Sequence, residues 1–108
     1  MALDITVIRT AARAGRITWR YHALMRAEER DITRKQAKQV LTDGDIIEQR
    51  PRAKPFPKCL LMRMQDDDQP LYVSAGYNAA DQRLYVITVH WLDPRKWEDP
   101  WRRRRKKP

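Results

Sequence analysis

The hydrophobic period changes once along this chain, at Gly44, and this change limits what the chain can fold into. Before Gly44, apolar residues recur every three or four positions, as they do on one face of a helix. After it, apolar and polar residues alternate, as they do on a strand with one buried face. Helices followed by strands predict an α+β domain, in which the helices cover one face of a four-stranded antiparallel sheet.

Three helices are expected in the first 44 residues. Asp4 is placed to cap the first of them, and Gly15 suits its end. Thr18 is placed to cap a second helix over roughly residues 19–30.

The third helix carries the clearest local signals. Thr33 and Gln36 have the spacing of a capping box, and Gly44 stands where a left-handed residue would end the helix. Four strands are expected after it, at residues 46–49, 58–64, 71–77 and 83–91.

The segment 83–91 is the longest and most β-prone of these strands. Apolar residues occupy both of its faces, which predicts a central place in the sheet. By strict alternation, His90 shares one face with Leu84, Val86 and Thr88, and the other face carries Tyr85, Ile87, Val89 and Trp91. If the last two strands pair as a hairpin, Tyr72 lies at the same end of the sheet as His90.

The length of 108 residues allows one domain, expected at residues 1–101. The net charge is +9, and residues 102–107 supply +6 of it. Residues 102–108 are therefore expected to form a disordered basic tail, for which two interpretations stay open. The tail, with Arg102 and Arg103 first in it, binds nucleic acid or acidic protein without reading sequence, or it is only a solvated terminus.

Several classes of protein are excluded by the composition. No apolar run approaches the roughly 18 residues of a membrane-spanning helix, and the first residues do not resemble a secretory signal. The single cysteine, Cys59, has no partner for a disulfide and, with two distant histidines, makes a poor metal site. We therefore expect a cytoplasmic protein without metal or cofactor.

The expected second helix holds the first candidate site. His22, Arg26 and Arg30 are spaced i, i+4, i+8, so they lie on one side of the helix. An imidazole beside two guanidinium groups suits a phosphate, because arginine supplies paired donors and histidine moves protons near neutral pH. The alternative is a surface face on which the arginines form salt bridges with Glu29.

The expected sheet holds further candidates. His90 either lines a site at the end of a central strand or is a hydrogen-bonded core histidine. Lys54 and Lys58 flank a proline-rich segment that either contacts a phosphate or forms a rigid loop over one sheet edge. Trp97 and Trp101 stand among cations, where they either stack on bases or fasten the C-terminal segment to the core.

Several segments together resemble the domain of unknown function 4258 family. Its opening pattern, H-A-x-x-R followed by E-R-x-I-[ST], is similar to residues 22–33, which include His22, Arg26 and Arg30. Further agreement lies at residues 40–48 (VLTDGDIIE), 57–61 (PKCLL), 70–73 (PLYV) and 86–94 (VITVHWLDP). The family pattern usually has histidine at the position of Tyr72 and tyrosine at that of His90, so this chain exchanges the two.

The family is similar to the RelE-like superfamily of plasmid toxins. The resemblance implies a RelE-like α+β architecture and a metal-independent endoribonuclease that acts on mRNA, either free or bound to the ribosome. It also implies a type II toxin–antitoxin pair, whose small antitoxin often carries a zinc-finger domain.

The leading hypothesis is therefore cleavage of single-stranded RNA. His22 or His90 would act as general base, and Tyr72 or the second histidine would protonate the leaving oxygen. Arg26, Arg30 and the lysines would stabilise charge on the phosphate. Two alternatives remain: a non-catalytic module that binds RNA or the ribosome, and a protein-interaction domain that docks an antitoxin.

Overall fold

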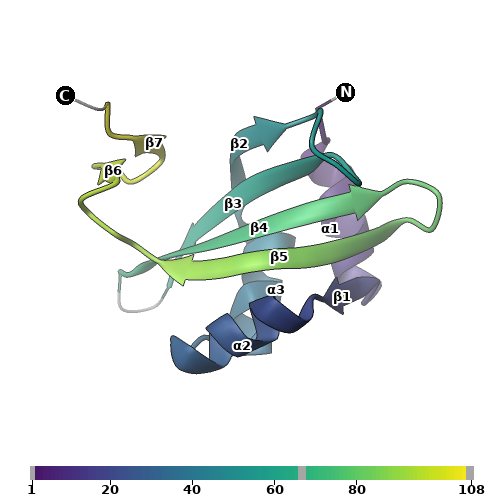
Figure 1. Cartoon of the computed structure of the whole chain (residues 1–108), viewed down its shortest axis with the longest axis horizontal. Helices are drawn as coiled ribbons and strands as arrows, with labels where there is room; N and C mark the ends of the chain where they lie inside the picture. The colour runs from purple at the N-terminus through teal and green to yellow at the C-terminus, as the bar shows by residue number, and fades with distance from the viewer. Residues whose placement is uncertain (1, 66–67, 107–108) are drawn as a thin grey trace.

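The computed structural model describes residues 2–65 and 68–106 of the chain, which form three helices and seven strands in those ranges (Figure 1). The elements in chain order are α1 (Ile5–Arg13), β1 (Ile17–Trp19), α2 (Tyr21–Glu29), α3 (Arg34–Asp43), β2 (Asp45–Arg50), β3 (Lys58–Met64), β4 (Pro70–Asn78), β5 (Arg83–Trp91), β6 (Trp97–Glu98) and β7 (Arg103–Arg104). None of these helices is long and apolar enough to cross a bilayer.

Strands β1 to β5 form one mixed sheet in the order β1-β5-β4-β3-β2. The α+β class is confirmed, but the prediction of a four-stranded antiparallel sheet is wrong. Strand β1 adds a fifth strand that runs parallel to β5, with Ile17 opposite Leu84 and Trp19 opposite Val86. Thr18 lies within β1 and caps no helix, because α2 begins only at Tyr21 after Arg20.

The N-terminal caps of α1 and α3 form as predicted, and so does the glycine end of α1. The Asp4 carboxylate accepts a hydrogen bond from the Thr6 amide at 2.7 Å, and Gly15 follows α1 with a φ of 75°. The side chain and amide of Thr33 exchange hydrogen bonds with those of Gln36, which completes the capping box.

Helix α2 covers the part of the β5 edge that β1 leaves open. Strand β1 reaches only to Val86, and beyond it the Arg30 guanidinium donates to the Val89 carbonyl at 2.7 Å. In return, the Trp91 indole donates to the Arg30 carbonyl at 2.7 Å. The Arg30 side chain thus satisfies a backbone carbonyl on the part of the β5 edge that β1 does not pair.

The main core lies between the helices and one face of the sheet. Its buried side chains come from all three helices and from β3, β4 and β5: Ile8, Ala11, Ala12, Ala23, Ala27, Ile32, Ala37, Val40, Leu41, Cys59, Leu61, Leu71, Val73, Ala75, Leu84, Val86 and Val89. Figure 1 shows α1 and α3 behind the sheet, so the opposite face of the sheet is left without helices. We call this second face the open face.

The C-terminal segment covers one end of the open face. Trp97 of β6 is buried there with Leu60, Met62 and Tyr72. The segment then turns through the β6–β7 hairpin and lies beside β2, where Arg104 contacts Glu48.

Residues 102–106 of the predicted basic tail make polar contacts with the rest of the chain. Arg102 pairs with Asp45 at 3.2 Å, Arg104 binds Glu48 through two hydrogen bonds of 2.6 and 3.0 Å, and the Arg105 amide donates to the Lys96 carbonyl at 2.8 Å. Two carboxylates of β2 thus pair with guanidinium groups of the tail. The last two residues of the predicted tail, 107 and 108, lie outside the described residues.

A bulge in β5 overturns the predicted faces of that strand. Ser74 pairs with Thr88 but Ala75 pairs with Val86, so Ile87 is an extra residue in the ladder. Leu84 and Val86 therefore face the helices, whereas His90 lies on the open face opposite Tyr72. The bulge brings Tyr85 and Ile87 to the same face as His90, which strict alternation had excluded.

Gly44 ends α3 in extended backbone (φ −80°, ψ 175°), so the predicted left-handed conformation is wrong. The glycine is required for another reason, which is close contact with the main chain. A Cβ atom on it would lie 2.5 Å from the Val40 carbonyl oxygen and 2.9 Å from that of Met62.

We expect Gly44→Ala to lower the free energy of unfolding by about 2 kcal/mol or more, because neither carbonyl can move as a side chain can. Gly76→Ala is the control, since its Cβ would meet ordinary contacts of 3.5 Å or longer. Urea unfolding of both variants measures the difference. Equal stabilities would contradict the close-contact explanation.

Candidate functional site

Three adjoining hollows cross the open face and form what we call the sheet groove. The first, of about 530 Å³, includes Arg30, Thr88 and His90, and the second, of about 320 Å³, shares Thr88 and His90 with it. The third, of about 120 Å³, lies next to the second, with Lys58 and Ile87 in common. The C-terminal segment bounds the groove at one end, and the proline-rich loop before β3 bounds it at the other.

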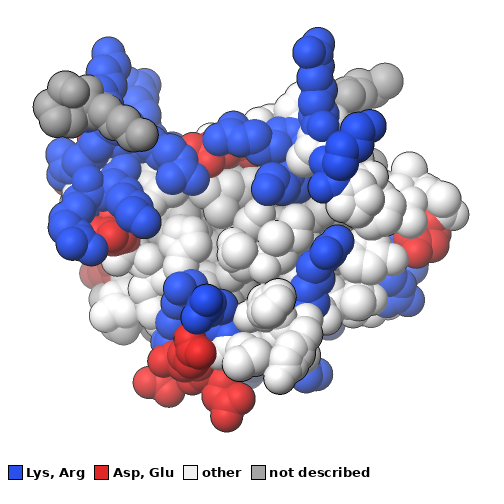
Figure 2. All heavy atoms as spheres, in the orientation of Figure 1, with Lys and Arg blue, Asp and Glu red and all other residues white. Residues whose placement is uncertain are grey.

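Cations outnumber carboxylates along the sheet groove. Its lining includes seven Lys and Arg side chains: Arg20, Arg30, Arg50, Lys54, Lys58, Lys96 and Arg104. The two carboxylates, Glu48 and Asp93, are each held by an arginine, at 2.6 Å from Arg104 and 3.1 Å from Arg95. Figure 2 shows an uncharged floor with Lys and Arg around much of its rim, an arrangement that attracts a polyanion.

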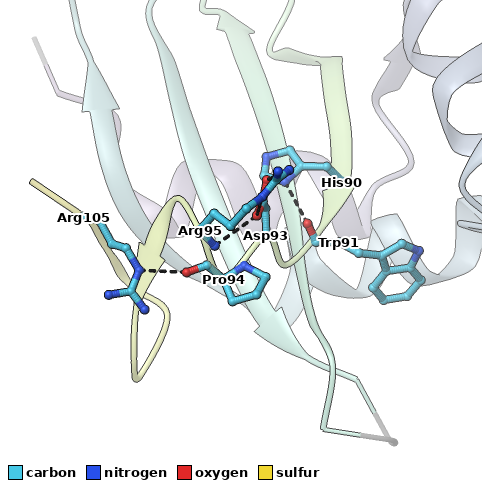
Figure 3. Close-up of polar contacts among 6 residues, drawn as sticks. All are labelled: His90, Trp91, Asp93, Pro94, Arg95 and Arg105. Atoms are coloured by element: carbon cyan, nitrogen blue, oxygen red, sulfur yellow. Dashed lines mark hydrogen bonds and ion pairs between the residues drawn. The ribbon is translucent and has the colours of Figure 1, made fainter. Parts of the chain in front are cut away.

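His90 lies where the two larger hollows meet. Its Nδ1 atom is 3.2 Å from the Trp91 carbonyl oxygen, which can only accept a hydrogen bond (Figure 3). In the neutral ring, Nδ1 therefore carries the proton and Nε2 keeps its lone pair. This tautomer suits a general base.

The surroundings of His90 disfavour its charged form. Burial lowers the pKa of His90 from its ordinary value, and the positive charges of Arg30, Arg104 and Lys96 lower it further, against the hydrogen bond to Trp91. His90 is therefore neutral at pH 7, among cations that suit an anionic ligand.

Tyr72 supports His90 from within the protein. Its ring stacks against His90 with 4.9 Å between centroids and against Trp97 with 4.8 Å. The side chain is fully buried, its hydroxyl donates to the Trp101 carbonyl at 2.6 Å, and burial raises the pKa of Tyr72 to about 12. The expected closeness of Tyr72 and His90 is confirmed, but the Tyr72 hydroxyl does not reach the sheet groove.

Arg104 joins the C-terminal segment to the sheet groove. Its guanidinium lies 4.7 Å from the centre of the Trp97 ring while it binds Glu48. Arg105 adds a hydrogen bond of 2.7 Å to the Pro94 carbonyl, and Arg95 folds back on Asp93 (Figure 3). These contacts hold Arg104 and Lys96 beside His90.

The helical candidates are divided by the structure. Arg30 reaches the sheet groove, but His22 and Arg26 are exposed on α2 and do not line its three hollows. Arg26 pairs with Glu29 at 3.0 Å, and the His22 ring lies edge-on to Tyr21. The surface salt-bridge alternative thus describes the surroundings of Arg26.

Lys54 and Lys58 both line the sheet groove, and their loop crosses the open face instead of covering a sheet edge. Arg102 and Arg103 line a separate hollow with Glu98 and Asp99. Sequence reasoning did not assign Arg20, Arg50, Phe56, Tyr85, Lys96 and Arg104 to a site. The sequence signal that these residues share is that they are basic or aromatic and lie in or next to the strands. This signal alone does not show which face of the sheet they lie on.

A comparison with known protein families identifies the family of this chain. Residues 19–91, more than half of the chain, match the profile of the family described as "Domain of unknown function (DUF4258)". The chain belongs to the DUF4258 family. The matched part contains the sheet from β2 to β5 and His90, whereas Lys96 and Arg104 of the groove follow it in the chain. Neither the curated proteins nor the solved structures gave a significant match.

We expect NMR titration of this DUF4258 protein to place the His90 midpoint below about 6.5, the ordinary value for histidine. Lys96→Gln should raise the midpoint, because it removes one repelling charge. Since the unfolded chain then binds the proton more readily, the free energy of unfolding should fall as the pH drops through about 6.5. A midpoint above 6.5, or no change in Lys96→Gln, would contradict this account of His90.

Proposed function

We propose that this protein is a metal-independent endoribonuclease that binds and cleaves single-stranded RNA in the sheet groove. The observation that carries the proposal is the position of His90, a neutral imidazole with Nε2 unprotonated, among Arg30, Lys96 and Arg104. A base surrounded by cations suits the transfer of a ribose proton next to a phosphate.

Binding in this proposal uses the length of the sheet groove. Seven cations distributed over three connected hollows suit a chain of phosphates better than a single small anion. The ribose 2′-hydroxyl distinguishes RNA from DNA and supplies the nucleophile.

The proposed reaction is an internal transesterification. His90 accepts the proton of the 2′-hydroxyl at Nε2, and the 2′-oxygen then attacks the adjacent phosphorus. Arg30 and Arg104 stabilise the negative charge on the phosphate oxygens. The bond from phosphorus to the 5′-oxygen breaks, and Lys96 gives that oxygen a proton. The products are a 2′,3′-cyclic phosphate and a 5′-hydroxyl, and exchange with water restores His90 and Lys96.

These roles revise those expected from the sequence. His90 takes the role of base, since His22 does not line the sheet groove. Tyr72 becomes a positioning residue, because its buried hydroxyl is occupied by Trp101. Lys96 replaces Tyr72 as the acid because it lines the same hollow as His90.

We further propose the finer assignment to the RelE-like toxins, with mRNA as substrate and a cognate antitoxin as partner. The support is the α+β class, with helices on one face of the sheet and a basic groove on the other. Expression should then arrest growth, and the product of a neighbouring gene should relieve the arrest. Arrest by His90→Ala as strong as by the wild type would contradict a toxin that acts by cleavage.

Substitution of His90 tests its role as the base. In EDTA, purified protein should cleave a single-stranded RNA, and His90→Ala should reduce the rate by roughly 10²–10⁴-fold. The matched control is His22→Ala, which removes the other histidine and should retain most of the rate. In the wild type, kcat/KM should fall on the acid side below about pH 6.5, where His90 gains a proton. Full activity of His90→Ala, or loss only in His22→Ala, would overturn the assignment.

Substitution of Lys96 tests its role as the acid. Lys96→Ala should slow cleavage of RNA but cleave a uridine 3′-aryl phosphate at close to the wild-type rate. The reason is that an aryl oxide leaves without needing a proton, whereas a ribose 5′-oxygen does need one. Equal losses on both substrates would show that Lys96 only binds phosphate.

One observation favours a second function, which is non-catalytic binding of RNA. Tyr72 is buried and His22 lies outside the sheet groove, so His90 is the single proton-transfer group from the sequence-based scheme that lines it. This alternative predicts RNA binding without product. It also predicts a salt slope near −3 if about four phosphates are neutralised, at about 0.7 per phosphate.

A further inference from the structure

Two aromatic rings form a stack at the end of the sheet groove farthest from the C-terminal segment. Phe56 of the proline-rich loop stacks on Tyr85 of β5, with 5.3 Å between centroids and 22° between planes. Both rings are partly exposed and line the hollow of about 120 Å³. The proposed cleavage steps do not use this pair.

The register of the sheet makes room for the stack. Gly76 lies between Lys58 of β3 and Tyr85 of β5 in one row across the open face. Phe56 crosses β4 above Gly76, where this row carries no side chain, and a Cβ on Gly76 would lie at an ordinary contact distance of 3.9 Å from the Phe56 Cβ. The bulge at Ile87 places Tyr85 on this face, so both rings belong to the sheet groove.

The charged side chains that line the hollow around the stack are all positive. Arg20, Lys54 and Lys58 line this hollow, and no carboxylate is among the side chains that line it. The Asp81 carboxylate near Tyr85 accepts a hydrogen bond of 3.1 Å from the Tyr85 hydroxyl but is not part of the lining. Aromatic rings beside cations fit a nucleotide, whose base stacks while its phosphates bind the cations.

We propose that Phe56 and Tyr85, with Arg20, Lys54 and Lys58, form a second subsite that stacks one base of the RNA strand whose phosphate lies at His90. This inference rests on the proposed function and deepens it. The subsite reads no base identity, since every base has a π-face, and it selects for single strands because a paired base cannot extend the stack.

The distance between the two subsites sets the length of RNA required. Tyr85 pairs with Gly76 and His90 pairs with Tyr72, four positions away on the unbulged strand β4, which corresponds to roughly 13 Å at about 3.3 Å per residue. A stacked strand rises by about 3.4 Å per nucleotide, so several nucleotides must span the two subsites. A dinucleotide cannot occupy both.

The experiment measures binding of 2′-O-methyl RNA, which cannot be cleaved because its 2′-oxygen is blocked. An eight-nucleotide strand and a dinucleotide are titrated into the wild type, Phe56→Leu, Phe56→Trp and Tyr21→Leu. Tyr21→Leu is the matched control, since Tyr21 is an exposed aromatic residue of α2 outside the groove lining. A 2-aminopurine base placed at each position in turn reports stacking through quenching of its fluorescence.

Phe56→Leu should weaken binding of the eight-nucleotide strand by at least about fivefold, the lower end of the effect of losing one base–aromatic stack. It should leave dinucleotide binding unchanged, and Phe56→Trp should retain the affinity and the quenching. Tyr21→Leu should behave as the wild type. Removal of the base at one position of the strand should weaken its binding to the wild type by the same factor. The same abasic strand should bind Phe56→Leu no more weakly than the intact strand does.

Two kinds of failure can be told apart. If the wild type binds neither RNA, the proposed function itself fails. If it binds the long strand and Phe56→Leu binds it equally well, or loses the dinucleotide to the same degree, the second subsite fails and the proposed function stands. A third outcome would overturn the proposal. If no 2-aminopurine position in the RNA is quenched, and an acidic peptide at the same concentration of charges displaces the long strand, the stack would be assigned to a protein partner instead.

Discussion

The pairing of β4 with β5, interrupted by the bulge at Ile87, is the constraint on which the rest of the structure depends. An unbroken ladder that kept Leu84 and Val86 in the helical core would place His90 on the same side as those residues. With one extra residue, the first half of β5 keeps its aliphatic side chains against the helices while His90 lies on the open face. The bulge thus reconciles the core of the fold with its candidate site.

The sheet groove exists because two irregular segments cover the ends of the open face and leave its middle free. At one end, Tyr72 stacks between His90 and Trp97 and binds the Trp101 carbonyl, so the C-terminal segment and the histidine share one support. At the other end, Phe56 crosses above Gly76. The floor between them remains accessible, and these covering segments supply three of the seven cations that line it, Lys54, Lys96 and Arg104.

Local signals predicted the local structure well. The capping box at Thr33 and the bounds of β3 and β5 follow from residue types that act within a few positions. The missed features depend on contacts between distant segments. Strand β1 has three residues and forms only beside β5, and Arg102 and Arg104 of the tail have their carboxylate partners on β2. The closeness of Tyr72 and His90 was predictable from a hairpin. The closeness of Lys96 and Arg104 to His90 depends on how the whole C-terminal segment folds back on the sheet, which local patterns do not show.

In the proposed mechanism, the electrostatics of His90 link RNA binding to proton transfer. In the free protein, burial and three cations keep the imidazole neutral, and the same cations attract phosphate. A phosphate bound among them cancels part of their repulsion, which raises the proton affinity of His90 when a proton must be accepted. A more basic histidine in the free protein would be partly protonated at neutral pH and would lose this capacity before substrate arrived. In the proposed reaction, the cations therefore act on the base twice: they keep it unprotonated in the free protein, and they bind the phosphate whose charge makes it more basic.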